Sequence, residues 1–178
     1  MTKRLRFYTK TALAAAIISL LAPFAIPIGP IPLSFASLAI SLLAGLLGPL
    51  VGFLAVLIYL AIGAVGVPVF SGFTAGFSIL LGPSVGFFAG YIVLSLVAGF
   101  ACRGKTAHRP WRILPFLLLG ELLLVSLGAV GYALVLQLSL AKAMLVAFLP
   151  FLLPAILKAA AASYLVCRLR ASKLLRIL

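Results

Sequence analysis

The stretch LSFASLAISLLAGLLGPLVGFLAVLIYLAIGAV, residues 33–65, contains no charged side chain and is divided by a Gly-Pro pair at Gly48 and Pro49. Proline cannot continue a preceding helix, so this pair predicts a tight turn between two apolar helices. Helices that are apolar on all sides are typical of membrane-spanning segments. Because 66% of the whole chain is hydrophobic, we expect an all-α integral membrane protein.

The charged residues are distributed unevenly, with 14 Lys and Arg against one acid. Most of the cations form three clusters that flank apolar runs. Cytoplasmic loops carry an excess of Lys and Arg, so the clusters place the N-terminus, the middle loop and the C-terminus on the cytoplasmic face. Contact with anionic lipid headgroups accounts for the net charge of +13, and no nucleic-acid partner is expected. The clusters are Lys3, Arg4, Arg6 and Lys10; Arg103, Lys105, Arg109 and Arg112; and Arg168, Arg170, Lys173 and Arg176.

Proline and glycine divide the chain into six expected transmembrane helices within one domain, residues 1–178. Six crossings return the chain to its starting side, which agrees with three cytoplasmic clusters. The Gly/Pro-rich segments 23–32 and 67–83 and residues 137–153 then lie outside. In an alternative, residues 140–169 form one kinked helix with the same topology. The first two expected helices cover approximately residues 8–25 and 33–47, and the third runs from the turn at 48–50 to about residue 65. The fourth and fifth cover approximately residues 84–102 and 113–136. The sixth begins at residue 154 and continues into the basic tail.

Small residues recur at the spacing of close helix contacts, in the pairs Gly86/Gly90 and Ala12/Ala16. In lipid, such residues allow two helix backbones to approach closely. The ordinary interpretation of a single pair is packing inside the protein.

The side chains that enzymes use are scarce. The chain has no aspartate, one glutamate (Glu121) and one histidine (His108), which lies in the basic loop. Catalysis by two carboxylates and a Ser-His-Asp triad are therefore excluded by count. Metal sites need several His, Cys or acidic ligands, and nucleotide loops need a GxxxxGK[ST] motif. We therefore expect a binding or transport protein with no cofactor, not an enzyme.

Lys158 lies within the last apolar run, about 15 Å from Arg168 at the rise of a helix. A lysine at this depth costs about 2.5–3.5 kcal/mol on insertion scales. Glu121 lies at a matching depth, so an ion pair with it would offset the cost. Alternatively, Lys158 binds an anionic ligand near the N-terminus of a helix that starts at Pro154. Snorkelling to the membrane surface is the third possibility.

Five blocks in order resemble the BioY family, the biotin-binding S components of energy-coupling factor transporters. They are PIPLSFASL (30–38), AGLLGPLVG (44–52), YLAIGAVGVPVFSGF (59–73), LLGPSVGFFAG (80–90) and PFLLPAILK (150–158). The resemblance implies a six-helix S-component bundle in a prokaryotic plasma membrane. It also implies a T component and two ATP-binding cassette ATPases as partners, docked through Ala12 and Ala16.

The resemblance further implies an outward-facing biotin pocket in which Lys158 contacts the biotin carboxylate. Three positions depart from the family pattern: Ala155 replaces an acid, Ala36 an amide residue and Phe87 a tyrosine. Because these changes make the pocket less polar, another small carboxylate vitamin or precursor stays open as the substrate. A non-transporting assembly subunit with a Lys158–Glu121 ion pair also stays open. The expected binding residues are Ser34, Phe35, Ser37, Phe70, Gly72, Gly82, Pro83, Phe87, Ala155 and Lys158.

Overall fold

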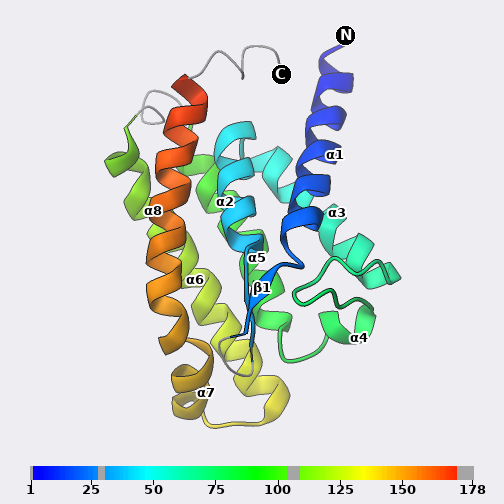
Figure 1. Cartoon of the computed structure of the whole chain (residues 1–178), viewed down its shortest axis with the longest axis vertical. Coiled ribbons are helices and arrows are strands. Elements are labelled where there is room, and N and C mark those ends of the chain that lie inside the picture. The colour runs from blue at the N-terminus through cyan, green and yellow to red at the C-terminus, as the bar shows by residue number, and fades with distance from the viewer. Residues whose placement is uncertain (1, 28–30, 104–108, 172–178) are drawn as a thin grey trace.

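The computed structural model describes residues 2–27, 31–103 and 109–171, and this part of the chain is mainly helical (Figure 1). It contains eight helices and one two-stranded hairpin. The predicted cluster members Lys105, Lys173 and Arg176 and the histidine His108 lie outside the described residues. The elements are α1 (Lys3–Leu21), β1 (Ala25–Ile26), β2 (Leu33–Ser34), α2 (Ala36–Leu47), α3 (Pro49–Val65), α4 (Phe77–Leu80), α5 (Val85–Ala101), α6 (Pro110–Leu136), α7 (Leu140–Ala147) and α8 (Leu149–Ala171).

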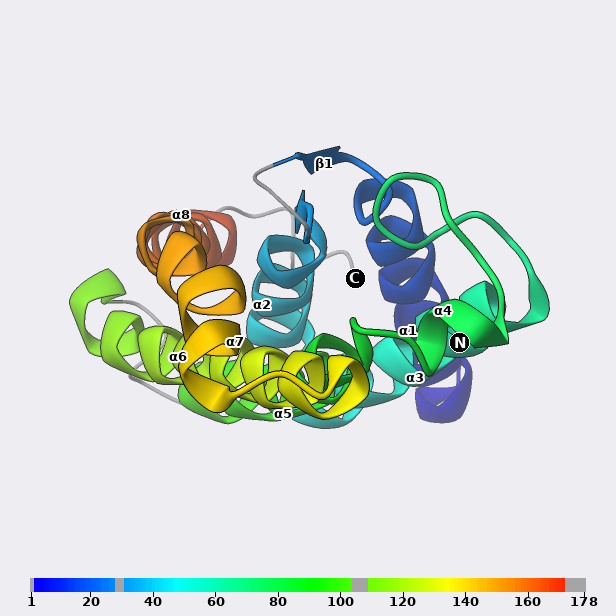
Figure 2. The ribbon, with the colours of Figure 1, turned by 90° about the horizontal axis from the view of Figure 1, so that it is seen from below.

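The long helices pack in two layers of three. The view along the bundle shows α1, α2 and α8 in one layer and α3, α5 and α6 in the other (Figure 2). Helix α2 contacts α5 and α8, and α5 contacts α3 and α6. The first residues of α1 and the last turn of α8 lie at one end of the bundle, whereas the hairpin, α4 and α7 lie at the other (Figure 1). We call the second end the loop end.

Each of the six predicted helices has a counterpart among these elements, although their lengths differ. Helices α6 and α8, with 27 and 23 residues, are long and apolar enough to cross a membrane. Helices α2, α3 and α5 are apolar but shorter. The predicted start of the first helix at residue 8 is wrong, because α1 begins at Lys3. Lysine and arginine are good helix formers, so the basic cluster extends the helix instead of preceding it.

The last helix also begins earlier than predicted, at Leu149 instead of Pro154. Pro150 is its second residue, a position where no intrahelical bond needs the missing N–H. Pro154 removes one backbone bond but does not end the helix. Phe148 separates α7 from α8, so the alternative of one kinked helix over residues 140–169 is wrong as well.

Glycine sets the turn after α2 and the contact between α5 and α6. Gly48 has φ +99, and the predicted Gly-Pro turn is confirmed because α3 begins at Pro49. A Cβ at Gly90 would lie 2.7 Å from Leu124 Cδ1, and one at Gly131 would lie 2.6 Å from the Cα of Gly86. The prediction that Gly86 and Gly90 pack inside the protein is therefore confirmed, since α5 and α6 meet there backbone to backbone.

Short extended segments cover the loop end. Antiparallel strands β1 and β2 pair Ala25 with Ser34 and Ile26 with Leu33. In the loop after α3, the N–H of Phe70 donates to the carbonyl of Thr74 at 3.0 Å. The N–H of Gly72 donates to the carbonyl of Pro23 at 2.9 Å and ties this loop to the segment after α1.

Candidate functional site

A cavity of about 220 Å³ lies in the half of the bundle towards the loop end. It is far larger than the roughly 10–15 Å³ that a cavity needs to hold one water molecule. Five of the long helices and the covering loops contribute to it, so the cavity depends on the whole fold. Its lining residues are Ile31, Pro32, Leu33, Ser34, Ser37, Tyr59, Phe70, Ser71, Thr74, Ile79, Ser84, Phe87, Phe88, Tyr91, Glu121, Leu124, Val125, Phe151, Ala155 and Lys158.

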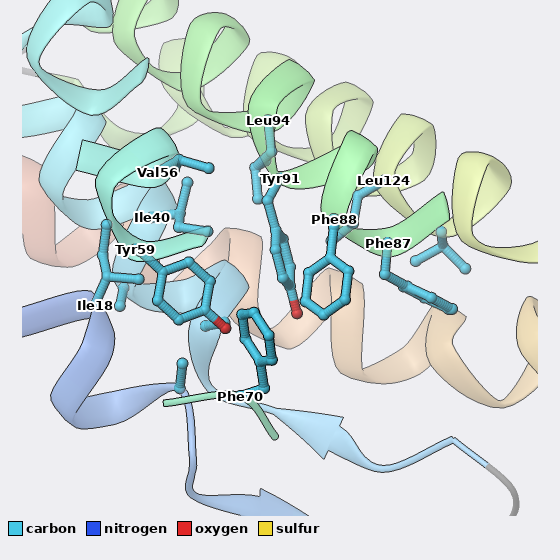
Figure 3. Packing of buried hydrophobic residues seen from close by; sticks show 14 of the residues in the cluster. Ile18, Ile40, Val56, Tyr59, Phe70, Phe87, Phe88, Tyr91, Leu94 and Leu124 are labelled. Atoms are coloured by element: carbon cyan, nitrogen blue, oxygen red, sulfur yellow. The ribbon is translucent and has the colours of Figure 1, made fainter. Parts of the chain in front are cut away.

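Aromatic rings form much of the cavity wall. The ring of Phe70 lies between those of Tyr59 and Phe88, with centroid distances of 5.7 and 4.8 Å. Figure 3 shows Tyr59 and Tyr91 with their hydroxyl groups directed towards the side of Phe70. A Cβ at Gly63 would collide with the Phe70 ring, so this glycine allows the ring to pack on α3. Such walls suit a flat, largely apolar guest.

Lys158 reaches the cavity from α8 and is held by two acceptors. Its Nζ donates to the backbone carbonyl of Ser34 at 2.7 Å and to Ser37 Oγ at 3.1 Å. The Ser34 hydroxyl donates to the carbonyl of Ala22 at 2.7 Å and accepts from the N–H of Ala36 at 3.0 Å, which fixes the start of α2. An ammonium group has three N–H donors, so one of them is left for a guest.

Glu121 on α6 is the other charged residue of the cavity and is 1% exposed. The alternative of a direct ion pair with Lys158 does not form within the described part of the chain. Instead, Ser37 Oγ accepts a hydrogen bond from Lys158 Nζ at 3.1 Å, and the charges of Lys158 and Glu121 attract each other without direct contact. Glu121 Oε1 has no hydrogen-bond partner in the described structure.

The predicted helix N-terminus beside Lys158 is also corrected. Because α8 begins at Leu149, Lys158 lies on the third turn of the helix. The free N–H groups of a helix belong to its first turn only, so they lie too far away to act on a ligand of Lys158. The ammonium is therefore positioned by β2 and α2 and not by a helix dipole.

Six of the ten predicted binding residues line the cavity, and four do not. Ser34, Ser37, Phe70, Phe87, Ala155 and Lys158 belong to the lining. Phe35 is 39% exposed and is not among the residues that line the cavity. Gly72 joins the covering loop to Pro23, and Gly82 and Pro83 belong to the turn before α5, so these three shape the loops instead of the wall.

The cavity lining also includes Tyr59, Tyr91 and Glu121, which were not predicted from the sequence. Tyr59 and Tyr91 lie inside apolar helices, where an aromatic residue gives no sign of facing a cavity. Glu121 did give a signal, because it is the one acid of the chain and its depth matches that of Lys158. Within the described residues, no cluster of His, Cys, Asp or Glu could hold a metal ion.

Relatives of this chain include proteins named as biotin transporters. The chain is 33% identical over 154 residues to biotin transporter BioY2 of Lactococcus lactis subsp. cremoris. The aligned residues make up 85% of this chain and 82% of the relative. The chain is 35% identical over 159 residues to the probable biotin transporter BioY of Pyrococcus horikoshii, with 89% and 93% covered.

A comparison of folds also finds a protein that binds biotin. The crystal structure of the S-component for biotin from an ECF-type ABC transporter matches with a TM-score of 0.86 and 28% identity, over 97% of this chain and 95% of that one. The sequence profile of the BioY family matches residues 1–174. Because this match spans nearly the whole sequence, the chain belongs to the BioY family.

Proposed function

We propose that this chain is the substrate-binding membrane subunit of a biotin uptake system that works with an energy-coupling factor module. The observation that carries the proposal is the ammonium of Lys158 in an otherwise largely apolar, aromatic cavity. Biotin combines an apolar bicyclic ring and alkyl chain with a cyclic urea and a carboxylate. The aromatic rings match its apolar part, and Lys158 matches one of its oxygen acceptors.

The proposed ligand contacts are made by the cavity residues that were also predicted from sequence. Lys158 donates its remaining N–H, while Phe70 and Phe87 pack on the apolar part of biotin. Ser34 and Ser37 hold the ammonium in place, and Ala155 leaves room beside it. No catalytic step and no cofactor are needed for this role.

The proposed topology has six crossings in one domain, made by α1, α2, α3, α5, α6 and α8. It is supported by the basic residues at the start of α1, after α5 and at the end of α8. It is also supported by the position of the start of α1 and the last turn of α8, which both lie opposite the loop end (Figure 1). Both termini then face the cytoplasm of a prokaryotic cell, and the cavity opens towards the outer face of the plasma membrane.

The proposed docking surface for the T component lies on α1. Ala12 and Ala16 are both exposed on this helix, so a partner helix could approach its backbone closely. The T component would connect the chain to two ATPases. These would supply the energy for transport by hydrolysing ATP, since this chain has no nucleotide-binding loop of its own.

Titration calorimetry with biotin on the purified protein in detergent tests the proposal. We expect Lys158→Met to weaken binding by about 10- to 150-fold, since a hydrogen bond to a charged group contributes about 1.5–3 kcal/mol. Lys142→Met is the matched control, because Lys142 is exposed on α7 and should leave binding unchanged. Equal affinity in the Lys158 variant, or tighter binding of another carboxylate vitamin, would contradict the assignment.

A further inference from the structure

The end of the bundle opposite the loop end carries basic side chains for which the chain offers no acidic partner. Arg103 follows α5, Arg109 and Arg112 lie at the start of α6, and Arg168 lies in the last turn of α8. All four are exposed, and we call them the arginine surface. The one acidic side chain of the sequence, Glu121, is buried about 13.5 Å further along α6 than Arg112. The counter-charge for this surface must therefore come from outside the chain.

Aromatic rings hold three of these four guanidinium groups. The distances from the guanidinium carbon to the ring centroid are 4.9 Å for Arg103 over Phe100, 5.9 Å for Arg109 over Trp111 and 5.4 Å for Arg168 over Tyr164. All three rings are more than half exposed, and Nε of Arg168 also donates to the Tyr164 hydroxyl at 2.9 Å. A guanidinium that is already held on a ring loses less freedom when its planar fork binds a phosphate group.

The basic residues of α1 are arranged differently. Lys3, Arg4 and Arg6 are exposed at the start of this helix, and in the described part of the chain no aromatic ring lies under a cation of α1. Figures 1 and 2 show α1 at one edge of the bundle, with the start of α6 and the last turn of α8 at the opposite edge. The arginine surface is therefore separate from the helix proposed to dock the T component.

The side chains next to the arginine surface indicate which kind of anion fits it. Towards the loop end, α6 exposes Phe116 and Leu119, and α8 exposes Leu157 and Leu165. Helices α6 and α8 pack against each other, so the arginines lie beside an apolar surface on the same two helices. A free phosphate or a nucleic acid would match the arginines alone. A phospholipid matches both parts, since it joins an anionic headgroup to apolar chains, and Trp and Tyr are enriched at headgroup depth.

We propose that the arginine surface and its three aromatic rings bind the headgroup of an anionic phospholipid in the cytoplasmic leaflet. The phosphate accepts hydrogen bonds from the guanidinium groups, and the acyl chains lie on the apolar surface of α6 and α8. This contact anchors the edge of the bundle opposite α1 and leaves α1 to the T component. The inference takes only the topology from the proposed function and does not depend on the guest in the cavity.

Native mass spectrometry of the full chain in mild detergent, with phosphatidylglycerol or phosphatidylcholine added, measures the bound lipid. We expect wild type to bind phosphatidylglycerol about tenfold more tightly than phosphatidylcholine. The triple variant Arg109→Gln/Arg112→Gln/Arg168→Gln should lose at least about tenfold in phosphatidylglycerol affinity, because each basic residue near an anionic lipid surface contributes about fivefold. A wild-type protein that binds the two lipids equally would overturn the proposal.

The matched control removes the same charge from the other edge of the bundle. Lys3→Gln/Arg4→Gln/Arg6→Gln should weaken phosphatidylglycerol binding by less than about threefold. Equal losses in the two triple variants would show that net charge alone attracts the lipid, which would overturn the proposal. Both variants should unfold at the wild-type temperature without lipid and should bind biotin like wild type, so failure of this inference leaves the proposed function standing.

Two further measurements test the rings and the source of the phosphate. Tyr164→Leu removes the ring under Arg168 without changing the charge and should weaken phosphatidylglycerol binding about threefold, whereas Tyr8→Leu, at an exposed tyrosine of α1, should not. Unchanged binding in the Tyr164 variant would contradict the proposal. Inorganic phosphate should fail to displace the lipid at an equal concentration, and displacement would show a site for free phosphate in place of a lipid site.

Discussion

The backbone contact between α5 and α6 predicts a sharp response to one added methyl group. A Cβ at Gly86 would lie 2.8 Å from the carbonyl carbon of Leu127 and 3.0 Å from the Cα of Gly128. These are backbone atoms, which cannot rotate away as a side chain can. In Gly86→Ala the two helices must therefore separate, and overpacking of this kind costs about 1–3 kcal/mol.

The separation should affect both stability and binding, because α5 and α6 carry neighbouring parts of the cavity wall. For a chain of this size each kcal/mol lowers Tm by about 2–4 °C, so we expect a decrease of about 5 °C in detergent. Biotin affinity should fall several-fold, since Tyr91 moves away from Glu121 and Leu124. Ala89→Val adds more bulk on the exposed face of α5 and should change neither quantity. A Gly86→Ala protein with wild-type Tm and affinity would refute this account of the contact.

Three further predictions concern the partner, the aromatic wall and the topology. Ala16→Leu should prevent most co-purification with a T component while leaving biotin binding intact, whereas Ala160→Leu, at an exposed alanine of α8, should not; full recovery of the Ala16 complex would count against docking on α1. Phe70→Ala should lower the free energy of unfolding by about 3–5 kcal/mol, measured by denaturant titration, and a loss below 1 kcal/mol would show that the ring is not part of the core. In a background without native cysteines, an impermeant thiol reagent should label Ser139→Cys but not Arg112→Cys in intact cells, and the reverse pattern would invert the proposed topology.

The helices could be predicted from sequence because their limits depend on local chemistry. The Gly48–Pro49 pair ends one helix and starts the next whatever surrounds it, and the prediction of this turn is confirmed. Pro154 misled the prediction, because a proline near the beginning of a helix can be its first residue or lie inside it. Here Pro150 takes the early position, and the choice depends on how α7 and α8 pack.

The cavity could be predicted only in part, since it depends on which faces of five helices meet. Lys158 was found from sequence because a cation inside an apolar run is conspicuous on its own. Its acceptors could not be derived in the same way, since the Ser34 carbonyl reaches it only after the hairpin places that residue beside α8. The choice of Ser34 and Ser37 as the acceptors of Lys158, in place of Glu121, is likewise a property of the folded structure.

The loop that carries Phe70 has a consequence for the kinetics of binding. Gly72 joins this loop to the segment after α1 through one backbone hydrogen bond, whereas the ring of Phe70 is 1% exposed inside the cavity wall. The loop is also held by the N–H of Gly76, which donates to the carbonyl of Gly63 at 2.8 Å, and by the ring of Phe73 packed on Phe24. A surface loop is nevertheless expected to open more readily than the helices. Opening of this loop would remove part of the cavity wall. A guest packed against Phe70 would therefore stabilise the closed loop and slow its own dissociation. Tight binding would then be expressed as a long residence time and not as rapid capture.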